Sequence, residues 1–184
     1  SGRQRFSANT PVVGVVYRLT PAASVYANLG RGFETPTFAE LSYRRTGTGL
    51  NFDLRPSRSR HLEAGAKAIL PARTRVNAAV FDVSTRDEIV VDTAAGGRTT
   101  FRNAGRTRRD GIELSAEKQF DAGIDAQIAY TRLSATYRDG FAAAPVAVAA
   151  GNRMPGVPDK QLYAQLRWRH APSGFVAAFD VQRR

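Results

Sequence analysis

Four short turns recur at nearly equal distances along the chain. Each contains Pro or Gly, and they begin at Thr20, Leu70, Phe120 and Ala171, about fifty residues apart. Apolar and polar residues alternate on both sides of each turn, whereas long segments rich in Arg and Gly fall midway between the turns. Alternation with a period of two is typical of β-strands with one apolar face. We therefore expect antiparallel strands with tight turns at one end and long loops at the other.

The strands can be followed by the parity of their apolar residues. Around the second turn, Leu62, Ala64 and Ala66 alternate with Glu63 and Lys67. Comparable alternation covers about eight segments: 13–19, 25–29, 61–70, 79–91, 112–117, 124–131, 162–169 and 175–181. A helical spacing fits none of them as well. The sequence predicts an all-β fold with about eight strands.

The difference between the two ends is typical of an outer-membrane β-barrel. No stretch approaches eighteen consecutive apolar residues, so no transmembrane helix is expected. Two soluble alternatives remain: an antiparallel sheet with one face on a core, and a kelch-type propeller, which shares the period but needs four strands per repeat. The small apolar residues, the sequence Arg167-Trp168-Arg169 and the long loops 32–58 and 138–159 favour the membrane barrel.

The net charge of +11 comes from 24 Arg and only 3 Lys, against 16 acidic residues. A basic domain can bind nucleic acid, but here the arginines are spread through every loop and every polar strand face. This distribution favours an anionic ligand, or contact with outer-membrane lipid and lipopolysaccharide phosphates, and no nucleic acid is expected. The chain has no Cys, which excludes disulfides and thiolate metal sites.

Four segments carry a more specific signal. They are Gly30–Leu41, Leu54–Lys67 with a Leu-x-Pro pattern, Asn103–Leu114 with Asn-x-Gly and Gly-x-Glu, and Arg153–Pro158. In order and spacing, these segments resemble TonB-dependent outer-membrane receptors. The resemblance implies that residues 1–184 are an internal part of a 22-stranded transmembrane β-barrel in the bacterial outer membrane. The plug domain and the TonB box of such receptors are absent from this sequence, so contact with TonB would require the missing plug region.

The resemblance also implies a function: uptake of a ferric siderophore or similar anionic metal chelate, with no resident cofactor. External loops 32–58, 93–98 and 138–159 would capture the ligand. Tyr43, Arg44 and Arg45 are the candidate ligand-binding residues, because two cations and an aromatic ring suit an anionic, often aromatic chelate. The alternative is that the two arginines are solvated loop charges.

Glu63, Lys67 and Glu113 have the polar parity of their strands and are expected to face the lumen. Gly111 precedes Glu113 and would permit a bulge or a close backbone approach. Arg58 stands near a position where the family commonly has an acidic residue, which implies a different local charge in the lumen. We expect these motifs to shape the barrel rather than to bind ligand.

Two other classes of function are alternatives to transport. A small autonomous barrel with a structural or adhesive role would require these strands to close on themselves. An enzyme would need a nucleophile with a base, or paired acids. The only imidazoles, His61 and His170, lie on opposite parities of different strands, and neither a Ser-His-Asp arrangement nor a metal-ligand cluster is evident. The sequence therefore predicts that the protein is not an enzyme.

Overall fold

A computed structural model describes residues 3–44, 46–142 and 146–184. These contain one short α-helix, α1 (Phe38–Leu41), one 3₁₀ turn, η1 (Asp121–Gly123), and ten strands: β1 (Val12–Thr20), β2 (Ala23–Glu34), β3 (Ser57–Leu70), β4 (Thr74–Arg86), β5 (Ile89–Ala95), β6 (Arg98–Asn103), β7 (Arg106–Gln119), β8 (Ile124–Tyr137), β9 (Lys160–His170) and β10 (Phe175–Arg183). Across the described residues, no helix has the length and apolar character needed to cross a membrane.

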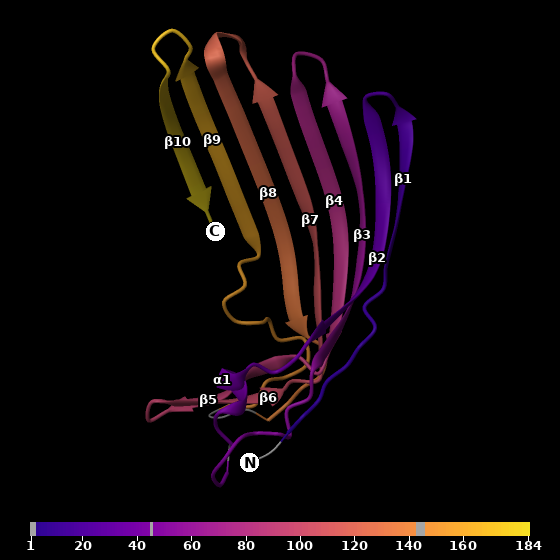
Figure 1. Ribbon diagram of the computed structural model, residues 1–184, viewed down its shortest axis with the longest axis vertical. Coiled ribbons are helices and arrows are strands. Elements are labelled where there is room, and N and C mark those ends of the chain that lie inside the picture. Colours follow the sequence, from indigo (N-terminus) through magenta and orange to yellow (C-terminus); the bar gives the residue numbers. More distant parts are fainter. Residues whose placement is uncertain (1–2, 45, 143–145) are drawn as a thin grey trace.

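Eight strands form one antiparallel sheet in the order β1-β2-β3-β4-β7-β8-β9-β10 (Figure 1). Strands β5 and β6 pair only with each other and form a separate hairpin. The prediction of an all-β antiparallel fold is confirmed. Strands β1 and β10 lie at opposite edges of the sheet, so these eight strands do not close into a small barrel of their own.

One predicted strand is wrong in its extent. The alternation suggested a single strand over 79–91, but β4 ends at Arg86 and β5 begins at Ile89. Asp87 between them has a φ of +56°, a left-handed conformation that Asp tolerates better than most residues. The chain therefore turns out of the main sheet, and the alternating residues beyond it belong to the β5–β6 hairpin.

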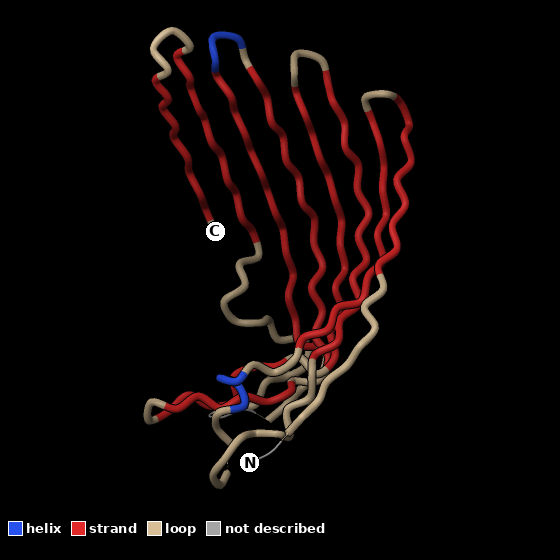
Figure 2. The backbone as a smooth tube through the Cα atoms, viewed as in Figure 1, coloured by secondary structure: helices blue, strands red, loops and turns tan. Residues whose placement is uncertain are grey.

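Short turns lie at one end of the sheet and the longer connections at the other (Figure 2). The turn between β3 and β4 has two consecutive residues with positive φ, Ala72 at +56° and Arg73 at +54°. Two such residues give a turn whose twist matches that of the flanking strands. The predicted asymmetry between the ends is present.

The strand register defines two faces of the sheet, because directly paired residues point to the same side. The polar face carries Tyr26, Glu63 and Lys67, and the register places Glu113 on the same face. The apolar face consists of rows of mostly small and medium residues with some aromatic ones, such as Val25, Ala66, Ala78, Leu114, Tyr130 and Leu162. Arg58 is four residues from Leu62 on β3 and lies on the same side as the apolar face, opposite Glu63 and Lys67. This position does not support the expected effect of Arg58 on the lumen charge.

The apolar face has no protein cover. Five apolar residues are buried in the described part of the chain, and none lies on this face: Leu54, Ala104, Ala135, Tyr137 and Met154. On the apolar face, Val13, Val80 and Phe179 are 70%, 54% and 72% exposed. An uncovered apolar surface across eight strands suits a lipid solvent and argues against the soluble-sheet alternative.

The apolar face ends along an oblique line. The last apolar pairs before the first charged residue are Leu29–Leu62 on β2 and β3, Val80–Ile112 on β4 and β7, and Tyr130–Leu162 on β8 and β9. Each pair lies two residues nearer the turns than the pair before it. Two residues span about 6.6 Å along a strand, and two strand spacings span about 9.6 Å across the sheet. The apolar boundary is therefore inclined by about 35° to the perpendicular of the strands, which equals the tilt of the strands from the normal to that boundary. Strands of membrane barrels tilt by this amount, so the apolar boundary is level with a membrane plane.

Gly111 lies where neighbouring strands leave no room for a side chain, which can be tested by substitution. Its register is unbroken, so the expected bulge is absent, but the expected close approach is present: an added Cβ would lie 2.3 Å from the Arg132 carbonyl oxygen and 2.8 Å from Phe81 Cζ. Gly111→Ala should destabilise the barrel by roughly 1–3 kcal/mol through overpacking. The midpoint of heat-modified gel mobility of the full-length protein measures this.

Gly30→Ala is the matched control, because its Cβ would meet only the Val12 side chain, at ordinary distances of 3.5 and 3.9 Å. An equal loss of heat resistance in both variants would show that the close approach at Gly111 is not the cause.

Candidate functional site

Three segments gather at the end of the sheet opposite the short turns (Figures 1 and 2). We call the described parts of 35–56, 87–105 and 138–159 the loop cluster. The segment 93–98, expected as a capture loop, is mostly strand: β5 ends at Ala95 and β6 begins at Arg98. Gly96 and Gly97 form its two-residue turn, with φ of +59° and +73°. Two positive φ values in a row explain why a hairpin forms there.

A small apolar core fixes the loop cluster on the polar face of the sheet. Ala135 and Tyr137 of β8 are buried against Ala104 and Met154 from two different loops. Phe141 packs its ring edge-on to Tyr137, with 5.1 Å between ring centroids, and Val148 also joins this core. The sequence did not decide whether the segment 138–159 packs over the barrel mouth. Phe141 and Val148, one on each side of 143–145, pack against this core.

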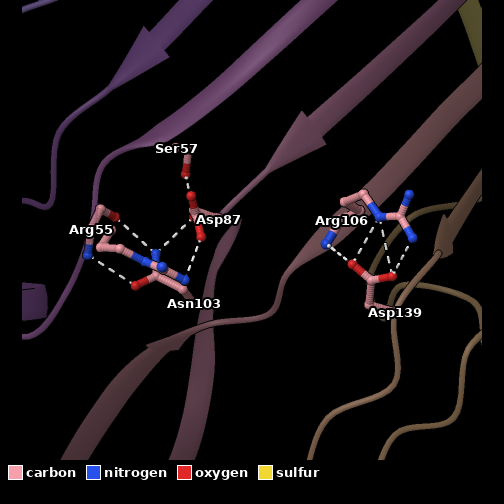
Figure 3. Close-up of polar contacts among 6 residues, drawn as sticks. All are labelled: Arg55, Ser57, Asp87, Asn103, Arg106 and Asp139. Atoms are coloured by element: carbon pink, nitrogen blue, oxygen red, sulfur yellow. Dashed lines mark hydrogen bonds and ion pairs between the residues drawn. The ribbon is translucent and has the colours of Figure 1, made fainter.

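Asn103 ties two loops together (Figure 3). Its Nδ2 donates to the backbone oxygens of Arg55 and Asp87, each at 2.8 Å, and its Oδ1 accepts from the Arg55 N–H at 2.9 Å. The Arg55 guanidinium pairs with the Asp87 carboxylate at 2.6 Å, and the Ser57 hydroxyl donates to the Asp87 backbone oxygen. The Leu-x-Pro and Asn-x-Gly segments therefore meet at one point, which supports a structural role for them.

Two further ion pairs fasten the cluster to β7. Arg106 donates through its side chain and backbone N–H to Asp139, with a shortest side-chain distance of 2.7 Å (Figure 3). These bonds lower the pKa of the Asp139 carboxyl. Glu88 accepts from Arg109 at 2.6 Å and from Thr107 at 2.7 Å. Burial alone would raise the pKa of Glu88, but these hydrogen bonds outweigh burial and leave the pKa below its ordinary value.

Helix α1 places the candidate aromatic residue of the first loop. Thr37 is its N-cap and accepts from the Glu40 N–H, while the Glu40 carboxylate accepts from the Thr37 N–H at 2.7 Å. This reciprocal capping box follows from Thr and Glu three residues apart. Tyr43 lies two residues beyond the helix and is 43% exposed.

The predicted ligand-binding residues are only partly brought together. The Arg98 guanidinium of β6 lies 5.6 Å from the centre of the Tyr43 ring, so the cation beside this ring comes from another loop. Arg44 lies 3.8 Å from Asp53 in a loose, exposed ion pair, and Arg45 lies outside the described residues. The sequence placed Arg98 in the expected capture loop 93–98 but did not single it out as a candidate ligand-binding residue.

The predicted lumen residues share the polar face, and Tyr26 connects two of them. Tyr26 donates its hydroxyl to Glu63 at 2.6 Å, and the Lys67 ammonium lies 5.2 Å from the centre of the Tyr26 ring. Glu113 lies on the same face, because it pairs with Ala79 of β4, which in turn pairs with Gly65 of β3. Tyr26 was not singled out from the sequence. That this face lines a lumen stays a prediction.

The described residues show little that could support catalysis. They contain no group of three or more His, Cys, Asp or Glu side chains able to hold a metal ion. Ser59 Oγ lies 2.7 Å from His61 Nε2, but the two are neighbours on one face of β3. No carboxylate in the described part of the chain hydrogen-bonds that imidazole, so the orienting group of a triad is not provided.

Asn103→Ala should loosen the loop cluster. The substitution leaves the Arg55 N–H and two carbonyl oxygens without this partner, at a cost of roughly 1–3 kcal/mol. Limited proteolysis of the full-length protein should then cut within 35–56 or 87–105 several times faster.

Asn77→Ala serves as the control, since Asn77 donates to Ser115 on the sheet and lies outside the loop cluster. Unchanged cleavage rates in Asn103→Ala would show that this amide does not hold the loops.

Glu88 should make the loop cluster sensitive to acid. Its folded pKa lies below the ordinary value of 4.5, so the unfolded chain binds more protons between the two values. The stabilisation is present above about pH 4.5 and is lost as the pH falls through the folded pKa. Glu88→Gln should lower heat resistance at neutral pH and reduce its loss between about pH 7 and pH 3. Part of the loss of heat resistance in acid should remain in the Glu88→Gln variant, because the pKa of Asp139 is also lowered.

Heat-modified gel mobility at each pH measures the effect of Glu88→Gln. Glu117→Gln, in an exposed pair with Arg75 at 3.1 Å, should change little. The same acid profile in wild type and Glu88→Gln would contradict the assignment.

With this geometry in place, the chain can be compared with known proteins. Residues 1–182 match the family described as TonB dependent receptor-like, beta-barrel. The metal-pseudopaline receptor CntO of Pseudomonas aeruginosa is 28% identical over 159 residues, covering 86% of this chain and 20% of that protein. The probable TonB-dependent receptor BfrD of Bordetella pertussis is 28% identical over 152 residues, covering 79% and 19%. The chain thus spans about a fifth of the length of these relatives.

Solved structures show the same fold. The copper transporter OprC superposes with a TM-score of 0.69 at 18% identity, covering 87% of this chain and 24% of that chain. The ferric-catecholate import receptor Fiu of E. coli K12 gives 0.64 at 22% identity, covering 86% and 22%. Members of this family are outer-membrane β-barrels of Gram-negative bacteria, and they are transport receptors, not enzymes. The chain belongs to the TonB-dependent receptor family and forms part of its β-barrel.

Proposed function

We propose that the protein containing this chain imports a metal chelate across the outer membrane by TonB-dependent transport. The observation that carries the proposal is the family match over residues 1–182, together with relatives named for metal complexes. Residues 1–184 act as one partial barrel domain in this proposal, with the apolar face toward lipid and the polar face toward the lumen. TonB acts through a plug region outside this sequence.

The exposed pair of Tyr43 and Arg98 is the proposed contact for the chelate. An aromatic ring beside a guanidinium offers stacking and a positive charge at the same place, which suits an anionic chelate with planar groups. Arg44 adds a second charge nearby, because its ion pair with Asp53 is loose and exposed. The ferric siderophore is the preferred cargo class, and another anionic metal chelate is the alternative.

Uptake is tested in cells that lack other receptors of this family and express the full-length protein. The probes are radiolabelled iron bound to a catecholate, iron bound to a hydroxamate, and nickel or zinc bound to an aminocarboxylate. We expect accumulation of one probe, abolished when TonB is deleted. If the cells accumulate none of the three probes, or if accumulation persists without TonB, the proposal is wrong.

The contact itself is tested with the purified receptor and the chelate found in that assay. Tyr43→Ala and Arg98→Gln should each weaken binding about five- to tenfold, because each removes one half of a cation–π pair. Phe38→Ala is the control: Phe38 is 76% exposed on α1, in the same loop. Equal affinities in wild type and both variants would show that the chelate binds elsewhere.

A further inference from the structure

Beyond the apolar boundary, the side of the sheet that carries the apolar face becomes rich in arginine. Arg31 follows Leu29 on β2, and Arg60 and Arg58 precede Leu62 on β3. Arg86 on β4 pairs directly with Arg58, so it lies on the same side. We call Arg31, Arg58, Arg60 and Arg86 the arginine patch. All four are exposed and, among the residues that the structure describes, none forms an ion pair.

The register sets like charges directly opposite each other. Arg31 pairs with Arg60 and Arg58 pairs with Arg86 across neighbouring strands. Like charges in directly paired positions destabilise a sheet. Such an arrangement is favourable when an anion lies between the guanidiniums and accepts hydrogen bonds from both.

The patch also lines a hollow large enough for a phosphorylated head group. This hollow has a volume of about 1020 Å³, and seven arginines and one carboxylate, Asp82, line it. Asp82 is already bound by Arg108 at 2.5 Å, and Arg106 by Asp139 at 2.7 Å. The positive charge of the four patch residues is left for an external anion.

We propose that the arginine patch binds the phosphate groups of lipopolysaccharide in the outer leaflet. The patch begins one side-chain row beyond Leu29 and Leu62, where the apolar surface ends. A bound glycolipid could therefore place its acyl chains on the apolar face and its phosphates among the guanidiniums. An imported chelate is a poorer fit, because this side of the sheet is the one turned toward lipid. This site is separate from the proposed chelate contact at Tyr43 and Arg98.

The test uses the full-length receptor purified in detergent and a fluorescent lipid A carrying two phosphates. Arg58→Gln combined with Arg86→Gln should weaken binding at least tenfold, because it removes one opposed pair. The matched control combines Arg18→Gln with Arg169→Gln, an equal loss of charge at two polar-face positions near the turns. The control should bind as wild type does, and all three proteins are checked for heat-modified mobility.

A second measurement needs only the wild-type protein and remains decisive if the double variant fails to fold. Lipid A with its phosphates removed should bind at least tenfold more weakly than the phosphorylated form, and millimolar inorganic phosphate should not displace the latter. Equal binding of the two lipids, or an unaffected Arg58/Arg86 variant, would overturn the proposal. Full displacement by inorganic phosphate would also overturn it, since it would indicate a small-anion site. None of these outcomes bears on chelate uptake, which is measured separately.

Discussion

Hydrogen bonding between neighbouring strands is the constraint on which the rest of this structure depends. In lipid, a backbone N–H or C=O without a partner costs several kcal/mol, so a spanning segment must be paired along its whole length. The ladders between β3, β4, β7 and β8 run without a register shift. Continuous pairing keeps every second residue on the same side, so one side can be apolar and the other polar along the whole strand. A single slip would exchange the two faces.

The same constraint explains why the two ends of the sheet differ. Tight turns keep the ladder intact almost to its last residue, and they need only two or three special conformations, as at Ala72 and Arg73. At the other end, the loops leave the sheet and their backbone groups need new partners. Asn103 supplies three such hydrogen bonds, two of them to Arg55 in another loop and one to Asp87, and the Thr37 capping box supplies two more. The loop cluster is thus held by side chains where the sheet is held by its backbone.

This division decides what could be predicted from the sequence. Period-two alternation depends on neighbouring residues, so strands, turns and the shared face of Glu63 and Lys67 followed directly from it. The fold of the loops depends on contacts between residues some fifty positions apart, such as Asn103 with Arg55. No local pattern encodes these contacts. The Asp87 turn was missed because alternation continued past it, and Arg98 was missed as the partner of Tyr43 because the two come from different loops.

Arginine serves three distinct purposes in this chain, which accounts for its excess over lysine. Where β7 meets the loop cluster, the half-buried guanidinium of Arg109 binds the Glu88 carboxylate at two points. On the polar face near the turns, Arg167 pairs with Asp125 at 2.7 Å. On the lipid side beyond the apolar boundary, Arg58 and Arg86 face each other with no acid between them. The first two settings are neutralised within the protein, whereas the third is neutralised only from outside, so the local charge balance distinguishes arginines that hold the fold from those available to a partner.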